Sequence, residues 1–327
     1  MSRSSSNFAS PKPQTQPACD PALLPDLCRL ALDRISILPI RMQLDEGAAS
    51  STVAMLRGVW GKAIHELFPE IYRDVFEVES RPGPASGSPP YIVRGAPPSP
   101  EWIPAVETIL VGNAVPLSAD LLRCWDYAAA NGLGKERRVA EIKRRETVSP
   151  DQSTRVDGES WPLSQAHWPI AVDAPCRIAF RVPVRLRRKG RLIDSPTLAD
   201  LVVSINRRIA GFLPTDLHDL WKRLSAQLLE VARNTPQGEW EGERSNVTRY
   251  SGRQKTEVDL HGVVGSLVLP QGIGALAPVM AAAQWLHLGK NTTIGMGQPL
   301  VEPLERGADP PGIPPARQAE SDNTTEG

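Results

Sequence analysis

The sequence predicts an α+β protein built from two successive units of the order β-α-β-β-α-β. Short runs alternate apolar and polar residues, as half-buried strands do, and longer segments repeat apolar residues at steps of three and four, as amphipathic helices do. The 327 residues also suit two domains at about 100 to 200 residues each. This order is that of the ferredoxin-like fold, a four-stranded antiparallel sheet with both helices on one face. We therefore expect two tandem ferredoxin-like domains, each with one sheet face left free.

The first domain is expected over residues 26–146. Residues 34–44 alternate like a strand, but Pro39 lacks a backbone N–H and favours an edge position or a bulge. Thr52 is a suitable N-cap for the next helix, and Pro69 ends that helix. The predicted elements are strand 34–44, helix 52–68, strands 90–94 and 106–117, helix 118–130 and strand 137–145.

The second domain is expected over residues 176–304, after a stretch rich in Ser, Asp and Pro, 147–175, that predicts a linker or insertion. Both ends of the chain, 1–25 and 305–327, have the composition of disordered segments. The predicted elements are strand 177–187, helices 196–213 and 216–232, strands 246–255 and 257–269, helix 273–288 and strand 296–302.

Composition excludes several classes of function. The longest apolar run, 273–288, is shorter than the roughly 20 residues that cross a bilayer. The first residues lack the apolar core of a secretory signal, so a cytoplasmic location is expected. The four cysteines form no C-x-x-C pair, and H-E-x-x-H is absent, so no metal is expected. Without a P-loop or a G-x-G-x-x-G motif, no nucleotide or other cofactor is expected either.

Basic residues are concentrated in one region, although the whole chain balances 37 basic with 37 acidic residues. Between Arg177 and Arg208 the sequence has nine basic residues and two acidic ones. Such a patch favours a polyanionic partner. The alternative is that these arginines are solvated or paired with Glu239, Glu241 and Glu243.

A glycine-rich segment, HLGKNTTIGMG at 287–297, follows the last predicted helix. Its glycines let the backbone turn sharply and leave N–H groups facing outwards for phosphate oxygens. The alternative is that they only let the chain leave a helix and enter an edge strand.

These motifs together resemble the CRISPR repeat-RNA processing endoribonucleases of the RAMP superfamily. RYSGRQ at 249–254, GVVG at 262–265 and HLGKNTTIGMG follow the family pattern in order and spacing. The segments 56–68, 91–95 and 131–138 resemble it more loosely, and the resemblance covers most of residues 34–303. It implies metal-independent cleavage of precursor CRISPR RNA within its repeats, by attack of a 2′-hydroxyl that leaves a 2′,3′-cyclic phosphate. The implied partners are CRISPR repeat RNA and, as further candidates, subunits of a CRISPR effector complex.

RNA binding is predicted for residues on two strands and in the glycine-rich segment. Alternate residues of a strand share one face, so Arg181, Arg185 and Arg187 would form a basic stripe. Such phosphate contacts give an affinity that falls steeply with salt. The further candidates are Arg249, Arg253, Lys290, Gly289, Gly295 and Gly297.

His65 is the candidate general acid or base. Histidine populates both protonation states near neutral pH, and in the family that the chain resembles the catalytic histidine is most often on the first helix. Lys62, one turn earlier, shares its helix face and could stabilise charge on the phosphate. The alternative is that His65 caps or packs the last turn of its helix.

One departure from the family pattern favours a rival interpretation, a non-catalytic RNA-binding subunit of a guide-RNA complex. Archaeal members pair their histidine with a tyrosine and a lysine. No tyrosine precedes His65 here, and Tyr72 is the nearest. A second histidine, His287, is expected to be a structural cap beside the glycine-rich segment rather than an RNA contact.

Overall fold

The computed structural model describes residues 21–45, 51–77, 88–95, 105–134, 136–245, 248–251 and 256–304. We call the part up to residue 165 the first half and the part from residue 176 the second half. The first half comprises η1 (Pro21–Leu23), α1 (Leu24–Leu32), β1 (Ser36–Leu44), α2 (Val53–Leu67), α3 (Pro69–Val75), β2 (Tyr91–Gly95), β3 (Ala105–Val111), η4 (Gly112–Leu117), α4 (Ser118–Ala130), β4 (Ile142–Val148), β5 (Thr154–Arg155), β6 (Trp161–Pro162) and η5 (Leu163–Gln165).

Both halves contain an antiparallel sheet with the same strand order. The second half comprises β7 (Cys176–Val184), β8 (Arg187–Arg188), β9 (Arg191–Leu192), α5 (Leu198–Ala210), η6 (Thr215–Leu217), α6 (His218–Asn234), β10 (Glu241–Ser245), β11 (Thr248–Ser251), β12 (Thr256–Asp259), β13 (Gly262–Leu269), η7 (Gly274–Leu276), α7 (Ala277–Leu286), η8 (Thr292–Ile294) and β14 (Leu300–Pro303). The first sheet runs β2-β3-β1-β4-β5, with β6 also on β1, and the second runs β10-β13-β7-β14. If the four strands β1 to β4 and the four strands β7, β10, β13 and β14 are each numbered along the chain, both sheets have the order second, third, first, fourth. The predicted α+β fold of tandem ferredoxin-like units is confirmed.

Strand β1 lies inside its sheet, so the edge position predicted from Pro39 is wrong. On one side β1 pairs with β3 throughout, and Pro39 faces Ile109. On the other side β6 pairs with Ser36 and Ile37, and pairing with β4 begins only at Ile40. On this second side Pro39 therefore lies in the gap between β6 and β4, where its missing N–H interrupts the pairing of neither strand.

Helices α2 and α4 match their predicted ranges closely, whereas α1 was not predicted. The Thr52 side chain accepts a hydrogen bond from the Met55 N–H and caps α2. Pro69 ends α2 as predicted but also begins α3, which was not predicted, because proline suits the first position of a helix. The strand predicted to start at Arg137 starts at Ile142 instead. A tight turn precedes it, in which Gly132 has φ +99° and an added Cβ would lie 2.2 Å from the Arg137 carbonyl oxygen.

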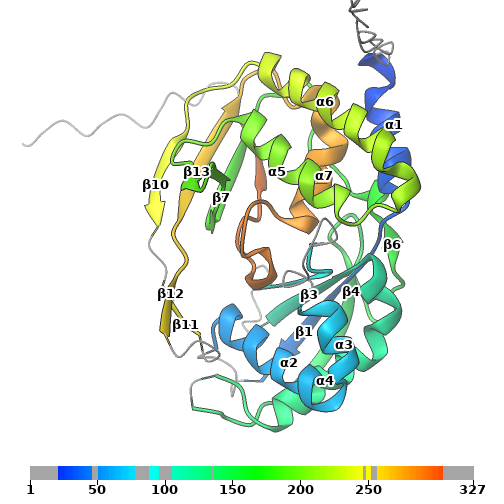
Figure 1. Cartoon of the computed structure of the whole chain (residues 1–327), viewed down its shortest axis with the longest axis vertical. Helices are drawn as coiled ribbons and strands as arrows, with labels where there is room; N and C mark the ends of the chain where they lie inside the picture. Colours follow the sequence, from blue (N-terminus) through cyan, green and yellow to red (C-terminus); the bar gives the residue numbers. More distant parts are fainter. Residues whose placement is uncertain are drawn as a thin grey trace, which may run out of the picture.

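The stretch 147–175, predicted to be a linker or insertion, contributes β5 and β6 to the first sheet. Trp161 in β6 is buried, and its indole N–H donates to the Val148 carbonyl at 3.0 Å. In the second half, the strand expected over 246–255 is replaced by β10 and by the separate hairpin of β11 and β12 (Figure 1). The predicted disordered ends lie outside the described residues, except for residues 21–25, where α1 begins.

The face of the first sheet that was expected to be free is buried at β2 and β3. Its helix-covered face packs Val93 and Leu110 against α2 and α4. Its other face carries Ile92 and Ile109, both with no exposed surface, and these belong to the same apolar cluster as α5, α6 and α7. Figure 1 shows helices α5, α6 and α7 of the second half above the first sheet, with the coil that follows α7 between α5 and α2. Burial of that face joins the two halves into one body.

Candidate nucleic-acid interface

A groove of about 910 Å³ lies between α5, the segment that follows β7 and the start of the glycine-rich segment. We call it the basic groove. Ser88 and Pro89 also line it, so it reaches the contact between the two halves. Among the described residues that line it, Asp200 is the one carboxylate. Its basic lining residues are Arg185, Arg187, Arg188, Lys189, Arg207, Arg208, Arg233 and Lys290.

One wall of the groove is the short hairpin of β8 and β9. Lys189 and Gly190 form its turn with φ values of +49° and +81°, the pair of positive angles that a tight two-residue hairpin requires. Arg188 forms an ion pair with Asp200 of α5. Asp200 also completes a capping box with Thr197 at the start of α5. The hairpin is thus tied to a helix end, and its cations line the groove.

The start of the glycine-rich segment also lines the groove, and the segment is held by hydrogen bonds inside the protein. The Gly289 N–H donates to the Ser204 hydroxyl at 2.8 Å, and the Lys290 N–H donates to the Arg185 carbonyl at 2.9 Å. The amides of Gly295 and Gly297 also donate to carbonyl oxygens of the chain. The expectation that these amides face outwards for phosphate is therefore wrong for these four, because each donates to an acceptor inside the protein. They shape the wall that carries Lys290.

Close approach of backbone explains the three glycines better than turning alone. Gly289, Gly295 and Gly297 have φ of +82°, +81° and +75°. A Cβ on Gly289 would lie 2.4 Å from the Arg185 carbonyl oxygen, and one on Gly297 would lie 1.9 Å from that of Leu288. A Cβ on Gly295 would lie 3.2 Å from Arg94 of β2, so this glycine faces the first half. Each glycine is required where two chain segments touch.

His287 is buried and structural, as expected. Its N–H closes α7 by donating to the Ala283 carbonyl, and its side chain has no exposed surface. Burial lowers the pKa of His287 well below its ordinary value, and the charges of Arg94 and Arg208 add to this effect. The imidazole is therefore neutral, and its Nδ1 lies 3.1 Å from the Met296 carbonyl near the other end of the glycine-rich segment.

His65 and Lys62 lie away from the basic groove. His65 is exposed near the end of α2, and its ring packs edge-on against Tyr72 of α3, with 5.0 Å between centroids. Lys62 forms an ion pair with Glu66 at 3.4 Å. Helix α2 meets the glycine-rich segment at Ala54, which packs near Ile294 and Met296. His65 is eleven residues further on, about 16 Å along the helix axis.

The predicted basic stripe on β7 is only partly formed. Arg185 and Arg187 line the basic groove, but Arg181 points elsewhere and forms an ion pair with Glu302 of β14 at 2.8 Å. The reason is that β7 ends at Val184, after an irregular stretch in its pairing with β13. Arg249 lies in β11, whose side chains are not described, and Arg253 lies outside the described residues.

Sequence reasoning missed two contributors to the groove, Ser204 and Arg233. Ser204 lies on α5 and Arg233 in the last turn of α6, so both are remote in sequence from the glycine-rich segment. Helical periodicity places Arg233 on a polar face, but nothing in the sequence shows which groove that face meets. The two residues could be found only from the packing of α5 against α6.

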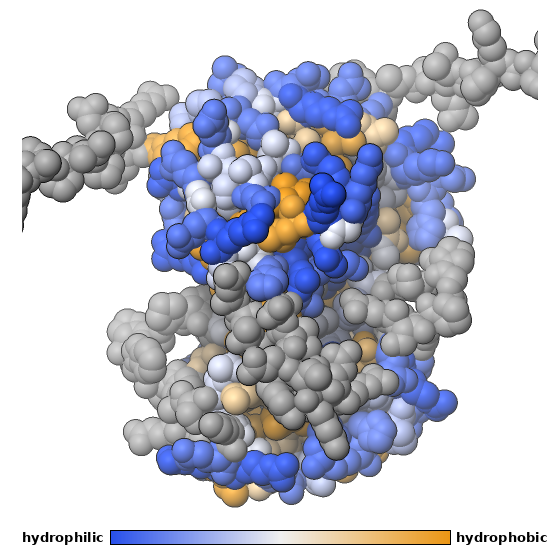
Figure 2. Space-filling view, turned by 60° about the vertical axis from the view of Figure 1, so that its left-hand side comes forward, coloured by the Kyte–Doolittle hydropathy of each residue, from blue (hydrophilic) through white to orange (hydrophobic). Residues whose placement is uncertain are grey.

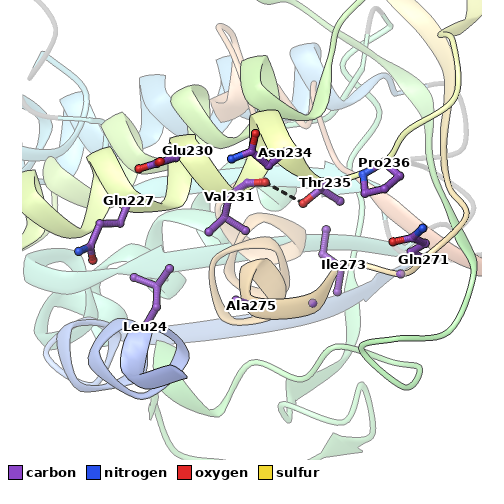
Figure 3. A pocket seen from close by; sticks show the side chains of 12 residues that line it. Leu24, Gln227, Glu230, Val231, Asn234, Thr235, Pro236, Gln271, Ile273 and Ala275 are labelled. Carbon is purple, nitrogen blue, oxygen red and sulfur yellow. Dashed lines mark hydrogen bonds between the residues drawn. The ribbon is translucent and has the colours of Figure 1, made fainter. Parts of the chain in front are cut away.

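A second cavity, of about 570 Å³, differs in chemistry from the basic groove. Its floor is apolar, with Leu24, Val231 and Ile273, and its rim carries Gln227 and Glu230 (Figure 3). It has no basic residue among the described residues that line it. The surface of the second half, in the upper part of Figure 2, is mostly hydrophilic on the face shown.

Neither a metal cluster nor a membrane helix is found in the part of the chain that the structure describes. No three His, Cys, Asp or Glu side chains there are grouped so that they could hold a metal ion. No helix there has the length and apolar character to cross a bilayer.

The comparison with protein families agrees with the motifs quoted above. Residues 178–299, which include all the basic residues that line the basic groove and the glycine-rich segment, match the family model for the CRISPR-associated endoribonuclease Cas6. Over these residues the chain is similar to Cas6. The resemblance to repeat-RNA processing endoribonucleases, predicted from the sequence, is thereby confirmed. No curated protein matches the chain.

Solved structures of Cas6 share the fold of the whole body. A Cas6 product complex superimposes with a TM-score of 0.54 at 15% identity, covering 82% of this chain and 99% of the other. Thermus thermophilus Cas6 gives a TM-score of 0.51 at 12% identity, with the same coverage of both chains. At such identities the likeness establishes the fold, and the function must be argued from the site.

Proposed function

We propose that this chain is an endoribonuclease that processes precursor CRISPR RNA and binds the repeat in the basic groove. The observation that carries the proposal is that eight of the described residues lining the groove are basic, whereas one, Asp200, is acidic and is already paired with Arg188. Such an excess of positive charge suits a phosphate backbone. The family match of residues 178–299 supports RNA processing as the reaction.

For the chemistry, we propose cleavage without a metal. The 2′-hydroxyl attacks the adjacent phosphorus, the bond to the 5′-oxygen breaks, and a 2′,3′-cyclic phosphate and a 5′-hydroxyl remain. His65 is the candidate proton carrier, because it is exposed and the Tyr72 ring packs against it. Lys62 is the candidate cation, one turn earlier on the same helix face. RNA that fills the basic groove would have to extend along α2 to reach them.

Cleavage of a labelled repeat RNA tests this proposal. Wild-type protein is expected to cut the RNA in EDTA and to leave a cyclic phosphate end, whereas His65→Ala is expected to lose activity by about 100-fold or more. Arg29→Gln is the control, because Arg29 is exposed on α1 and forms its ion pair with Asp26 of the same helix. Activity lost in EDTA would contradict the metal-free step. Full activity of His65→Ala would remove that residue from the site.

A second function is favoured by one observation, the absence of histidine and tyrosine from the described lining of the basic groove. Its one carboxylate, Asp200, is engaged with Arg188 and Thr197. A groove of this kind binds RNA but offers no proton carrier, as in a non-catalytic RNA-binding subunit of a guide-RNA complex. Tight repeat binding without cleavage, by wild type and by His65→Ala alike, would decide for this alternative.

A further inference from the structure

The contact between the two halves contains a buried carboxylate, Glu107, held between two arginines. Glu107 lies on β3 and faces Arg41 of β1 on one side and Arg94 of β2 on the other. The Arg41 guanidinium donates to Glu107 Oε1 at 2.9 and 2.7 Å, and Arg94 Nε donates to Oε2 at 2.6 Å. Burial alone would raise the pKa of Glu107, but Arg94 and Arg41 lower it below its ordinary value. The carboxylate is therefore charged.

Arg94 continues from this carboxylate into the second half. Its Nη1 donates to the Gln284 carbonyl at 3.0 Å, and its guanidinium lies 5.3 Å from the Trp285 ring centre. Gln284 is in the last turn of α7, where carbonyls lack helical partners and the helix dipole favours a positive charge. Arg94 thus caps a helix of the second half from a strand of the first.

His287 connects Arg94 to the far end of the glycine-rich segment. His287 Nδ1 lies 3.1 Å from the Met296 carbonyl, and its Nε2 lies 3.4 Å from Arg94 Nη1. A carbonyl can only accept and a guanidinium can only donate, so a neutral imidazole with its proton on Nδ1 satisfies both. Gly295, next to Met296, also lies against the backbone of Arg94. The far end of the segment is therefore fixed by Arg94.

We propose that Arg94 is a positioning residue that, held by Glu107, fixes the glycine-rich segment against the first half and so sets the shape of the basic groove. Its effect on RNA rests on the function proposed above. Its effect on the order of the glycine-rich segment does not, because the contacts exist without RNA.

Arg41 provides a matched control. It pairs with the same carboxylate, but among the described residues it bonds to none of the second half. Arg94→Gln and Arg41→Gln therefore each remove one positively charged partner of Glu107. Only Arg94→Gln also breaks the contacts with α7 and His287. Arg94→Lys is the conservative variant, which keeps the charge near Glu107 but cannot make the forked contact.

The experiment measures hydrogen exchange of the full-length protein without RNA, with Gly289, Lys290, Gly295 and Gly297 as reporters and α4 as internal reference. Arg94→Gln is expected to speed exchange of the Gly295 and Gly297 amides by about tenfold over Arg41→Gln, since a hydrogen bond to a charged group is lost. Arg94→Lys is expected to show the same local effect with less loss of thermal stability. If Arg94→Gln does not fold, the comparison of Arg94→Lys with Arg41→Gln is the test. Equal exchange in the Arg94 and Arg41 variants would overturn the proposal.

A binding titration with labelled repeat RNA separates this inference from the proposed function. If the segment loosens and RNA affinity falls by about tenfold in the Arg94 variants only, the positioning role and the proposed function both stand. If the segment loosens but wild type binds no RNA, the positioning role stands and the proposed function fails. If the segment keeps its exchange rates while RNA affinity changes, the positioning role fails.

Discussion

Replacing Gly297 by alanine tests the claim that close backbone contact shapes the glycine-rich segment. Gly297 has φ +75°, and an added Cβ would lie 1.9 Å from the Leu288 carbonyl oxygen. The left-handed conformation costs about 1–2 kcal/mol for a residue with a Cβ. The clash would also break two hydrogen bonds. Leu288 N–H donates to the Gly297 carbonyl at 2.8 Å, and Gly297 N–H donates to the Pro183 carbonyl at 3.0 Å. At about 0.5–1.5 kcal/mol for each bond, the total loss of unfolding free energy is about 2–5 kcal/mol.

Gly190→Ala is the control for this prediction. Gly190 has φ +81° in the turn between β8 and β9, but a Cβ there would meet nothing within 4 Å. Its cost is the conformational strain alone, about 1–2 kcal/mol. Urea unfolding followed by circular dichroism measures both variants, with the transition slope checked for two-state behaviour. Equal destabilisation of the two variants would refute the argument from close contact.

Two further predictions concern the same segment. Because the pKa of His287 is lowered in the folded chain, acidification below about pH 6.5 protonates the unfolded chain first, so stability should fall by up to about 1.4 kcal/mol per pH unit. Urea titrations at pH 7 and pH 5 should show a smaller fall for His287→Gln, and a parallel fall in both proteins would contradict this role. Ser204→Ala removes the acceptor of the Gly289 N–H and should cost about 1 kcal/mol in urea unfolding. No loss of stability in that variant would mean that solvent replaces the hydroxyl.

Local sequence signals predicted most of the fold correctly. Thr52 and Pro69 marked the ends of α2, and the range predicted for α4 matches the observed one. Strand ends were less well predicted, because they depend on partners that are distant in sequence. Pro39 illustrates this limit: its effect depends on β4 and β6, which join β1 from more than a hundred residues away.

The candidate site was predicted as chemistry but not as geometry. The basic patch and the glycine-rich segment were recognised, and the structure brings Arg185, Arg187 and Lys290 together. Arg181 was grouped with them because alternation was extended past Val184, where β7 ends. Arg94 and Glu107 were not singled out, since a lone arginine and a lone glutamate on two strands look like solvent-facing residues. Only burial of the supposed free sheet face reveals their role.

Repeat-RNA binding as a function of salt tests the central claim, that the basic groove binds the phosphate backbone. The logarithm of affinity should fall linearly with the logarithm of salt concentration, with a slope of about 0.7 per contacted phosphate for single-stranded RNA. The combined change Arg185→Gln, Arg187→Gln and Lys290→Gln should reduce that slope by about 2 and weaken binding at low salt, whereas Arg29→Gln should change neither. An unchanged slope in the triple variant, with its fold intact, would contradict the account.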